Sequence, residues 1–295
     1  MRISRPENFA CCLCYILAFV ICTWLNGCGT KQHESAETKT EGEAGVVRDD
    51  VLQSLQSSLV TDLLQFSDEA LNKGLLNDVD RTNRYLKRGN KAAAAANLGI
   101  YLSDLSCLVA HGRRDEANRY FQACLALSES IGMKKQFSEA VQLNFNEIIA
   151  GDSTLKKSLG SEFKDATNTA EEEEFQKLHA AALTGYYIEE LYLLASFIKS
   201  RHANQDSIFF ATLGVFASQK DELGNLIAYF DHVQLKSAGI SVYQELLALQ
   251  EKYWAIDTDH FLSLQKTRPD LVLQDKSLQD VFASLSAIRQ HIIDY

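Results

Sequence analysis

Two carboxylic acids, Asp104 and Glu190, stand on helical stripes that are otherwise apolar. Each acid lies three residues after a tyrosine and four before a leucine, and these neighbours are Tyr101 and Leu108, and Tyr187 and Leu194. Residues three and four apart share one face of a helix. If the two helices face each other, the acids could converge, which would raise the pKa of at least one carboxyl group or gather a cation. The candidate binding residues are therefore Tyr101, Asp104, Tyr187 and Glu190.

A purely structural explanation of these acids also stays open. Buried carboxyl groups are normally hydrogen-bonded, and each acid could meet a Tyr hydroxyl, a helix end, or an arginine such as Arg113 or Arg201. The two explanations differ in how close together they place the carboxyl groups of Asp104 and Glu190.

The sequence contains no recognisable catalytic or cofactor motif. There is no H-E-x-x-H, G-x-S-x-G, P-loop or G-x-G-x-x-G, and the seven histidines include no pair at metal-ligating spacing on one helix. The acids of Asp257 to His260 are better explained as a cap on the helix that enters Phe261, and Glu171 to Glu174 as an acidic helix start. We therefore predict no enzyme activity, no metal ligands and no cofactor.

The elements that position these residues are expected to be helices. The chain has 295 residues, 46% of them hydrophobic, and only two prolines, Pro6 and Pro269, which favours helices over a turn-rich β architecture. Helical spacing of apolar residues recurs from Val47 onward and includes segments 209–218, 223–235, 242–254 and 278–293. We predict an all-α fold of antiparallel helical hairpins, either tetratricopeptide-like or an irregular bundle.

Charge makes nucleic acid a poor partner. Lys and Arg total 29 against 39 Asp and Glu, so the net charge is -10, and no continuous Lys/Arg block is present.

One helical hairpin is predicted from Ala92 to Gly132, with its turn near Gly112. Its residues match a tetratricopeptide-type unit in part, at Tyr101, Leu108, Gly112, Ala117, Phe121 and Cys124. General packing of two antiparallel helices could produce the same pattern.

An internal echo links two distant helices. Ala94 to Leu108 aligns without gaps to Ala180 to Leu194, and seven of the fifteen positions are identical, including Gly99 with Gly185. Small residues let helices approach closely. The echo predicts either two independent alanine-rich interfaces or a duplicated unit with pseudo-twofold packing.

The N-terminal residues are typical of a secretory signal. Arg2 and Arg5 precede an uncharged apolar run from Phe9 to Leu25. The run ends in Leu25-Asn26-Gly27-Cys28, which resembles a bacterial lipobox, and this resemblance implies cleavage before Cys28 and its lipidation, with palmitate among the acyl chains. Gly29 rather than Asp after the cysteine implies, by the same resemblance, the outer membrane of the cell envelope, with the domain facing the periplasm or the surface.

An uncleaved anchor helix is the alternative, since 17 apolar residues are the lower bound for crossing a bilayer. Either way, we predict a signal at 1–27, a flexible tether at 28–46 and a helical domain at 47–295, which could divide into halves 47–165 and 166–295.

The mature chain would keep two cysteines, Cys107 and Cys124. In a hairpin that turns at 111–115 they are offset by about 7.5 Å along the axis, beyond comfortable disulfide geometry. We interpret both as core residues, with a disulfide as the alternative.

The segment from Asn97 to Leu105 together with the 117–132 helix resembles uncharacterised helical lipoproteins of Bacteroidota. The resemblance implies a location and a fold but no reaction. We therefore predict an envelope lipoprotein whose helices form a non-catalytic binding or scaffold module for a protein partner. The alternative is a binder of a small molecule, glycan or cation in a cleft between the two halves.

Overall fold

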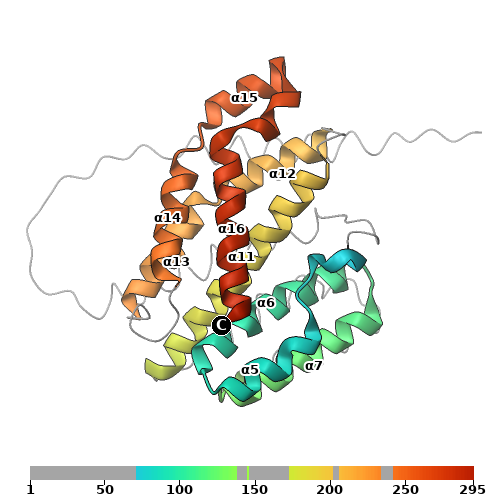
Figure 1. Ribbon diagram of the computed structural model, residues 1–295, viewed down its shortest axis with the longest axis vertical. Coiled ribbons are helices and arrows are strands. Elements are labelled where there is room, and N and C mark those ends of the chain that lie inside the picture. The colour runs from blue at the N-terminus through green and yellow to red at the C-terminus, as the bar shows by residue number, and fades with distance from the viewer. Residues whose placement is uncertain (1–70, 138–144, 146–172, 202–205, 234–241) are drawn as a thin grey trace, which may run out of the picture. The chain divides into compact units, whose positions relative to one another are not determined.

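The computed structural model describes residues 71–137, 145, 173–201, 206–233 and 242–295 (Figure 1). Every regular element in these ranges is a helix, and no strand occurs among them, so the predicted all-α class is confirmed. All of these residues belong to one compact unit, Glu41–Tyr295. The predicted signal, the lipidated Cys28, the tether, the helical pattern of 47–70 and the start of the acidic run at 171–172 lie outside the described residues.

The predicted hairpin is formed by α6 (Lys91–Ala110) and α7 (Arg114–Ser130). Asn90 caps α6, since its side chain accepts a hydrogen bond from the Ala93 N–H at 3.1 Å. The turn between the helices uses Gly112 at φ 68°, a left-handed conformation that glycine adopts without steric cost. The hairpin is thus present, whereas its tetratricopeptide character stays a prediction.

Helix α11 (Glu173–Ser200) packs against α6 at a very close crossing. A Cβ atom added at Gly99 would lie 1.8 Å from the Ala182 carbonyl oxygen, and one added at Gly185 would lie 1.8 Å from the Ala96 carbonyl oxygen. These four positions are the aligned pairs of the internal echo, so the two copies contact each other reciprocally. Such contacts are what a pseudo-twofold relation requires.

Four further α-helices correspond to the apolar segments of the second half. They are α12 (Ser207–Ser218), α13 (Lys220–His232), α14 (Tyr243–Trp254) and α16 (Lys276–Asp294). Between the last two lie α15 (Thr258–Thr267) and the 3-10 helix η6 (Pro269–Gln274). Asp257 caps α15 by accepting from the His260 N–H at 2.9 Å, as the sequence predicts.

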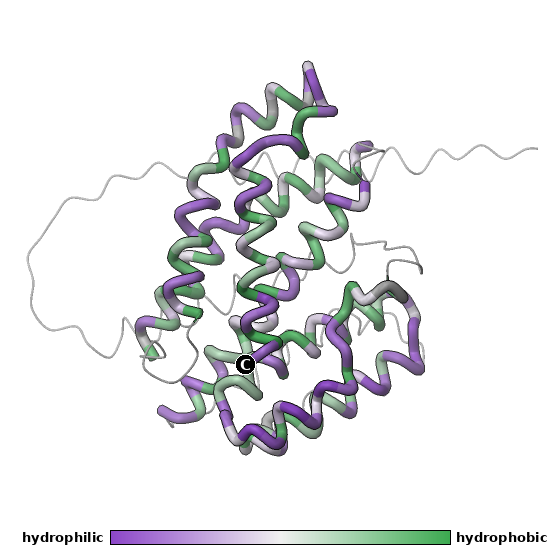
Figure 2. The backbone as a smooth tube through the Cα atoms, viewed as in Figure 1, coloured by the Kyte–Doolittle hydropathy of each residue, from purple (hydrophilic) through white to green (hydrophobic). Residues whose placement is uncertain are grey.

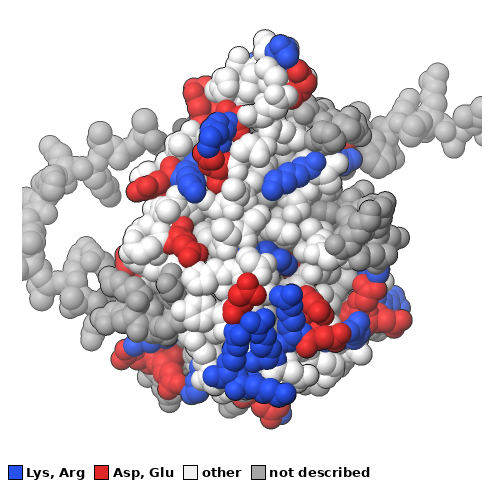
Figure 3. All heavy atoms as spheres, viewed as in Figure 1, with Lys and Arg blue, Asp and Glu red and all other residues white. Residues whose placement is uncertain are grey.

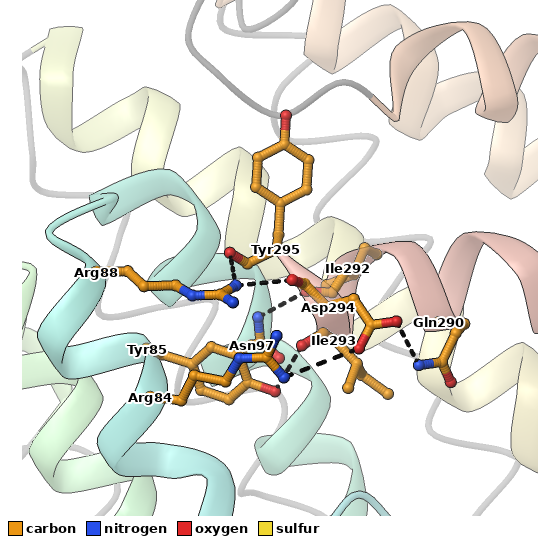
Figure 4. A network of polar contacts seen from close by, with 9 residues as sticks. All are labelled: Arg84, Tyr85, Arg88, Asn97, Gln290, Ile292, Ile293, Asp294 and Tyr295. Carbon is orange, nitrogen blue, oxygen red and sulfur yellow. Dashed lines mark hydrogen bonds and ion pairs between the residues drawn. The ribbon is translucent and has the colours of Figure 1, made fainter.

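Short helical elements flank the hairpin, and one of them, α5 (Thr82–Arg88), contacts the C-terminal end of α16. The others are η1 (Leu71–Leu75) and η2 (Val79–Arg81), which precede α5, and α8 (Lys134–Phe137), which follows α7. The last carbonyls of α16 accept side-chain hydrogen bonds from Tyr85 at 3.0 Å, Arg88 at 2.7 Å and Asn97 at 2.9 Å (Figure 4). These bonds satisfy groups that a helix end leaves without intrahelical partners.

The core is built around α6 and α11, which are buried on nearly every side. In contrast, hydrophilic and hydrophobic residues alternate along α16, as expected for a helix with one solvent face (Figure 2). By length and composition α6 could cross a membrane, but its apolar window is 94% buried inside the protein, which is typical of a core helix. Cys107 and Cys124 are free and buried, so the core interpretation is confirmed.

Candidate functional site in the helical core

A buried carboxyl–arginine cluster forms where α6, α11 and α16 meet. Asp104 of α6 and Glu189 of α11 are fully buried, and Arg289 of α16 is 8% exposed. The Arg289 guanidinium donates two hydrogen bonds to the Glu189 carboxylate, from Nε at 2.5 Å and from Nη2 at 2.8 Å. Its carbon Cζ also lies 4.2 Å from the centre of the Tyr192 ring. We call Asp104, Glu189 and Arg289 the core cluster.

The electrostatics of the core cluster favour the neutral form of Asp104. Burial raises the pKa of Asp104 well above its usual range, and the neighbouring Glu189 charge raises it further. Burial also raises the pKa of Glu189, against the opposing effects of the Arg289 charge and of the hydrogen bonds that Arg289 donates. Burial alone would lower the pKa of Arg289, but Glu189 raises it overall. The balance of these effects favours a neutral Asp104 beside the Glu189–Arg289 ion pair.

The core cluster holds the backbone of residues 75–78, which precede α5. The Asp104 carboxyl oxygen Oδ2 accepts a hydrogen bond from the Asn77 N–H at 2.9 Å, and Arg289 donates to the Leu75 carbonyl at 3.3 Å. Two tyrosines add to this grip: Tyr101 donates to the Asp78 carbonyl at 2.8 Å and Tyr120 to the Asn77 carbonyl at 2.6 Å. The segment 75–78, which has little regular structure, is thus fixed by side chains from three helices.

The expected meeting of Asp104 with Glu190 is replaced by a meeting with Glu189. Glu190 instead neighbours Tyr186: burial raises the pKa of the Tyr186 hydroxyl well above its usual range, and the nearby Glu190 carboxylate raises it further. This is the arrangement that the structural explanation predicts for Glu190. Asp104 fits neither explanation fully, because it shares its site with a second acid and with Arg289.

The other two candidate residues also serve internal contacts. Tyr101 belongs to the grip on segment 75–78, whereas Tyr187 donates a hydrogen bond to the Gln219 carbonyl at 2.8 Å, where α12 ends and α13 begins. Arg113 pairs with Glu116 and Arg201 with Asp206, so neither arginine meets the candidate acids through an ion pair. Of the four residues proposed from the sequence, Asp104 and Tyr101 thus hold the same segment, 75–78, whereas Tyr187 and Glu190 lie in other internal contacts.

Sequence reasoning missed Glu189 and Arg289. Glu189 follows Gly185 by four residues, so it shares the face by which α11 touches α6, and this spacing could have identified it. Arg289 lies 100 residues further along the chain on a different helix, and no local pattern links it to Glu189.

The chemistry open to the core cluster is proton sharing and charge neutralisation inside the protein. Its carboxyl oxygens are sealed from solvent, so a substrate in solution has no path to them in this structure. Within the described ranges, no group of three or more His, Cys, Asp or Glu side chains is placed to hold a metal ion. The arrangement is suited to holding backbone segments in place.

Comparison of the chain with family models, with curated proteins and with solved structures finds no match.

Proposed function

We propose that this protein is a bacterial cell-envelope lipoprotein, anchored through Cys28 in the outer membrane, whose helical domain is a non-catalytic binding or scaffold module for a protein partner. The anchor rests on the basic, apolar and lipobox-like residues before Cys28. The scaffold role is supported mainly by one observation: polar groups of the core cluster, of Tyr101 and of Tyr120 form hydrogen bonds to the backbone of segment 75–78. A protein that must present a surface in a constant geometry needs such internal fixation.

The contact surface of this scaffold is proposed to include Trp254. This side chain is 66% exposed at the end of α14, next to Tyr253, which is fully buried in the core. Tryptophan is enriched among the residues that dominate protein–protein binding energy, because its large ring buries much area at low entropic cost. A partner that covers Trp254 would remove this apolar ring from water.

A ligand cleft between the two halves of the domain has less support. At the crossing of α6 and α11 the helices touch through Gly99 and Gly185, and even one added methyl group would overlap a carbonyl oxygen. The described contact between the two copies of the echo thus leaves no space for a small molecule.

The anchor is tested by metabolic labelling with an alkynyl fatty acid. The wild-type protein should incorporate the label and float with membranes, whereas a Cys28→Ser variant should not be labelled. Equal labelling of both proteins, or none in the wild type, would contradict lipidation at Cys28.

The partner is tested by placing a photo-crosslinking amino acid at position 254 in intact cells. A discrete crosslinked protein should be recovered from position 254 and not from Asn118, an exposed polar position on α7 that serves as the control. No crosslinked protein at 254, or the same products at both positions, would argue against a partner at this surface.

A further inference from the structure

A cluster of exposed cations occupies the outer side of α5 and its two ends. Between Arg81 and Lys91 the chain has five basic residues and no acidic one, although the whole protein has a net charge of -10. All five side chains belong to exposed residues, and Figure 3 shows a gathering of Lys and Arg on this face of the molecule. We call these residues the basic face: Arg81, Arg84, Lys87, Arg88 and Lys91.

The basic face is held rigidly by the buried side of the same short helix. Thr82 and Tyr85 are 8% and 2% exposed, and Leu86 packs against the core, so the remaining positions must point outward. The Tyr85 hydroxyl donates to the Ile293 carbonyl and Arg88 donates to the Asp294 carbonyl, which ties α5 to the end of α16 (Figure 4). The cations therefore project from a fixed, convex surface.

Neighbouring carboxylates neutralise only part of this charge. Arg84 lies 4.0 Å from the Asp294 carboxylate, and Lys91 lies 2.7 Å from that of Glu174. Arg88 donates hydrogen bonds to the main-chain oxygens of Asp294 and Tyr295, which hold its guanidinium at the end of α16. Arg81 and Lys87 form no ion pair with any described residue. Arg81, at the end of η2, and Lys87, on α5, thus carry two positive charges that no carboxylate in the described part of the chain pairs with.

We propose that the basic face docks on the anionic lipid headgroups of the membrane in which Cys28 is anchored. This inference rests on the proposed lipid anchor. A flat anionic surface suits cations spread over a convex helix, because headgroup attraction needs no groove and no fixed spacing. The predicted tether reaches on the order of 23 Å, so docking is an intramolecular step at high effective concentration. The acidic remainder of the domain is repelled by the same lipids, which orients α5 toward the membrane.

The test uses the lipidated full-length protein in vesicles of phosphatidylcholine with and without phosphatidylglycerol. An Asn83→Cys variant carries an environment-sensitive dye on the outer side of α5, while Ser263→Cys carries it on α15, outside the basic face. The buried Cys107 and Cys124 are expected to stay unlabelled. The dye at position 83 should be shielded from acrylamide only in the anionic vesicles, and salt should reverse this shielding. The dye at position 263 should respond equally in both lipids.

Charge reversal separates the basic face from the anchor. Each cation near an anionic surface contributes about fivefold in affinity, so Arg81→Glu with Lys87→Glu should lower the ratio of docked to undocked protein by at least about 25-fold. Lys220→Glu with Lys266→Glu makes the same charge change elsewhere and should leave the shielding at position 83 nearly unchanged. Flotation with neutral vesicles measures the anchor alone and should not change in either variant, so failure of lipidation is distinguishable from failure of docking.

Three results would overturn the docking proposal. The first is equal shielding at position 83 in neutral and anionic vesicles, and the second is an equal effect of the two double variants. The third is shielding by duplex DNA or polyglutamate where anionic vesicles give none, which would assign the basic face to a soluble polyanion.

Discussion

Replacement of Arg289 by methionine tests the core cluster most directly. Arg289→Met keeps a long apolar side chain but removes the only cation that is hydrogen-bonded to the fully buried Glu189 among the described residues. Loss of one partner from a buried ion pair costs about 3–5 kcal/mol, because the remaining charge stays desolvated. The variant also loses the hydrogen bond to the Leu75 carbonyl and the contact with the Tyr192 ring, and we count the cost of both within this energy range. We therefore expect about 4 kcal/mol less free energy of unfolding.

The chain offers a matched control for this variant. Arg268 also donates two hydrogen bonds to a carboxylate, that of Asp270, at 3.0 and 2.8 Å. Both of these side chains are 59% exposed, so water screens their attraction. Arg268→Met should leave the urea midpoint unchanged, although the geometry of the pair resembles that of Arg289 with Glu189.

The assay is urea unfolding followed by circular dichroism. With a slope of about 3 kcal/mol per molar urea, Arg289→Met should lower the midpoint by more than about 1 M. The double variant Glu189→Leu, Arg289→Met removes both charges and should recover part of the loss. Equal midpoints for Arg289→Met and Arg268→Met would refute the conclusion that Glu189 is an ion that depends on its arginine.

Three other predictions follow from the same contacts. Gly185→Ala should destabilise the fold by about 1–3 kcal/mol, because the added Cβ meets the Ala96 carbonyl oxygen. Gly214→Ala is the control: an added Cβ there has nothing within 4 Å, so the variant should stabilise the fold by up to about 1 kcal/mol. Equal effects of the two variants in thermal unfolding would contradict the close crossing. Because the folded pKa of Asp104 is raised, the unfolded chain releases this proton first, so stability should fall as the pH rises from the ordinary Asp pKa toward the folded one, at most about 1.4 kcal/mol per pH unit. Asp104→Asn should show a shallower fall over this interval in urea unfolding, and a slope equal to that of the wild type would contradict a raised pKa of Asp104. Tyr120→Phe should cost about 1 kcal/mol and increase hydrogen exchange in segment 75–78, while unchanged exchange there would show that the hydroxyl does not hold this segment.

Local sequence signals predicted the helices well where a cap chemistry marked their ends. Asp257 places a side-chain acceptor at the start of α15, and Gly112 allows the left-handed turn after α6, as the sequence predicts. These features act within a few residues of the chain, so one sequence is enough to read them. The sequence echo between the α6 and α11 segments likewise predicted two similar helices, and the structure adds that they contact each other.

The partners of the acids depended on the tertiary structure. In the sequence Asp104 aligns with Glu190, but the crossing at Gly185 turns Glu189 toward α6 and leaves Glu190 to Tyr186. Both helices are buried nearly all round, so the apolar stripes that carry Asp104 and Glu190 did not single out the faces by which the helices meet. A rotation of one residue, about 100° around a helix, decides which carboxyl group enters the cluster.

The sequence by itself determined the all-α class, the helix ends marked by caps and the list of groups able to carry charge. Only the tertiary structure decided that Glu189 and Arg289, 100 residues apart, form a buried pair and that the pKa of Asp104 is raised beside them. The physical reason is the distance along the chain between the groups that interact. Caps and turns are satisfied by neighbours along the chain, whereas desolvation and ion pairing depend on what packs around a group, which the local pattern of residues does not contain.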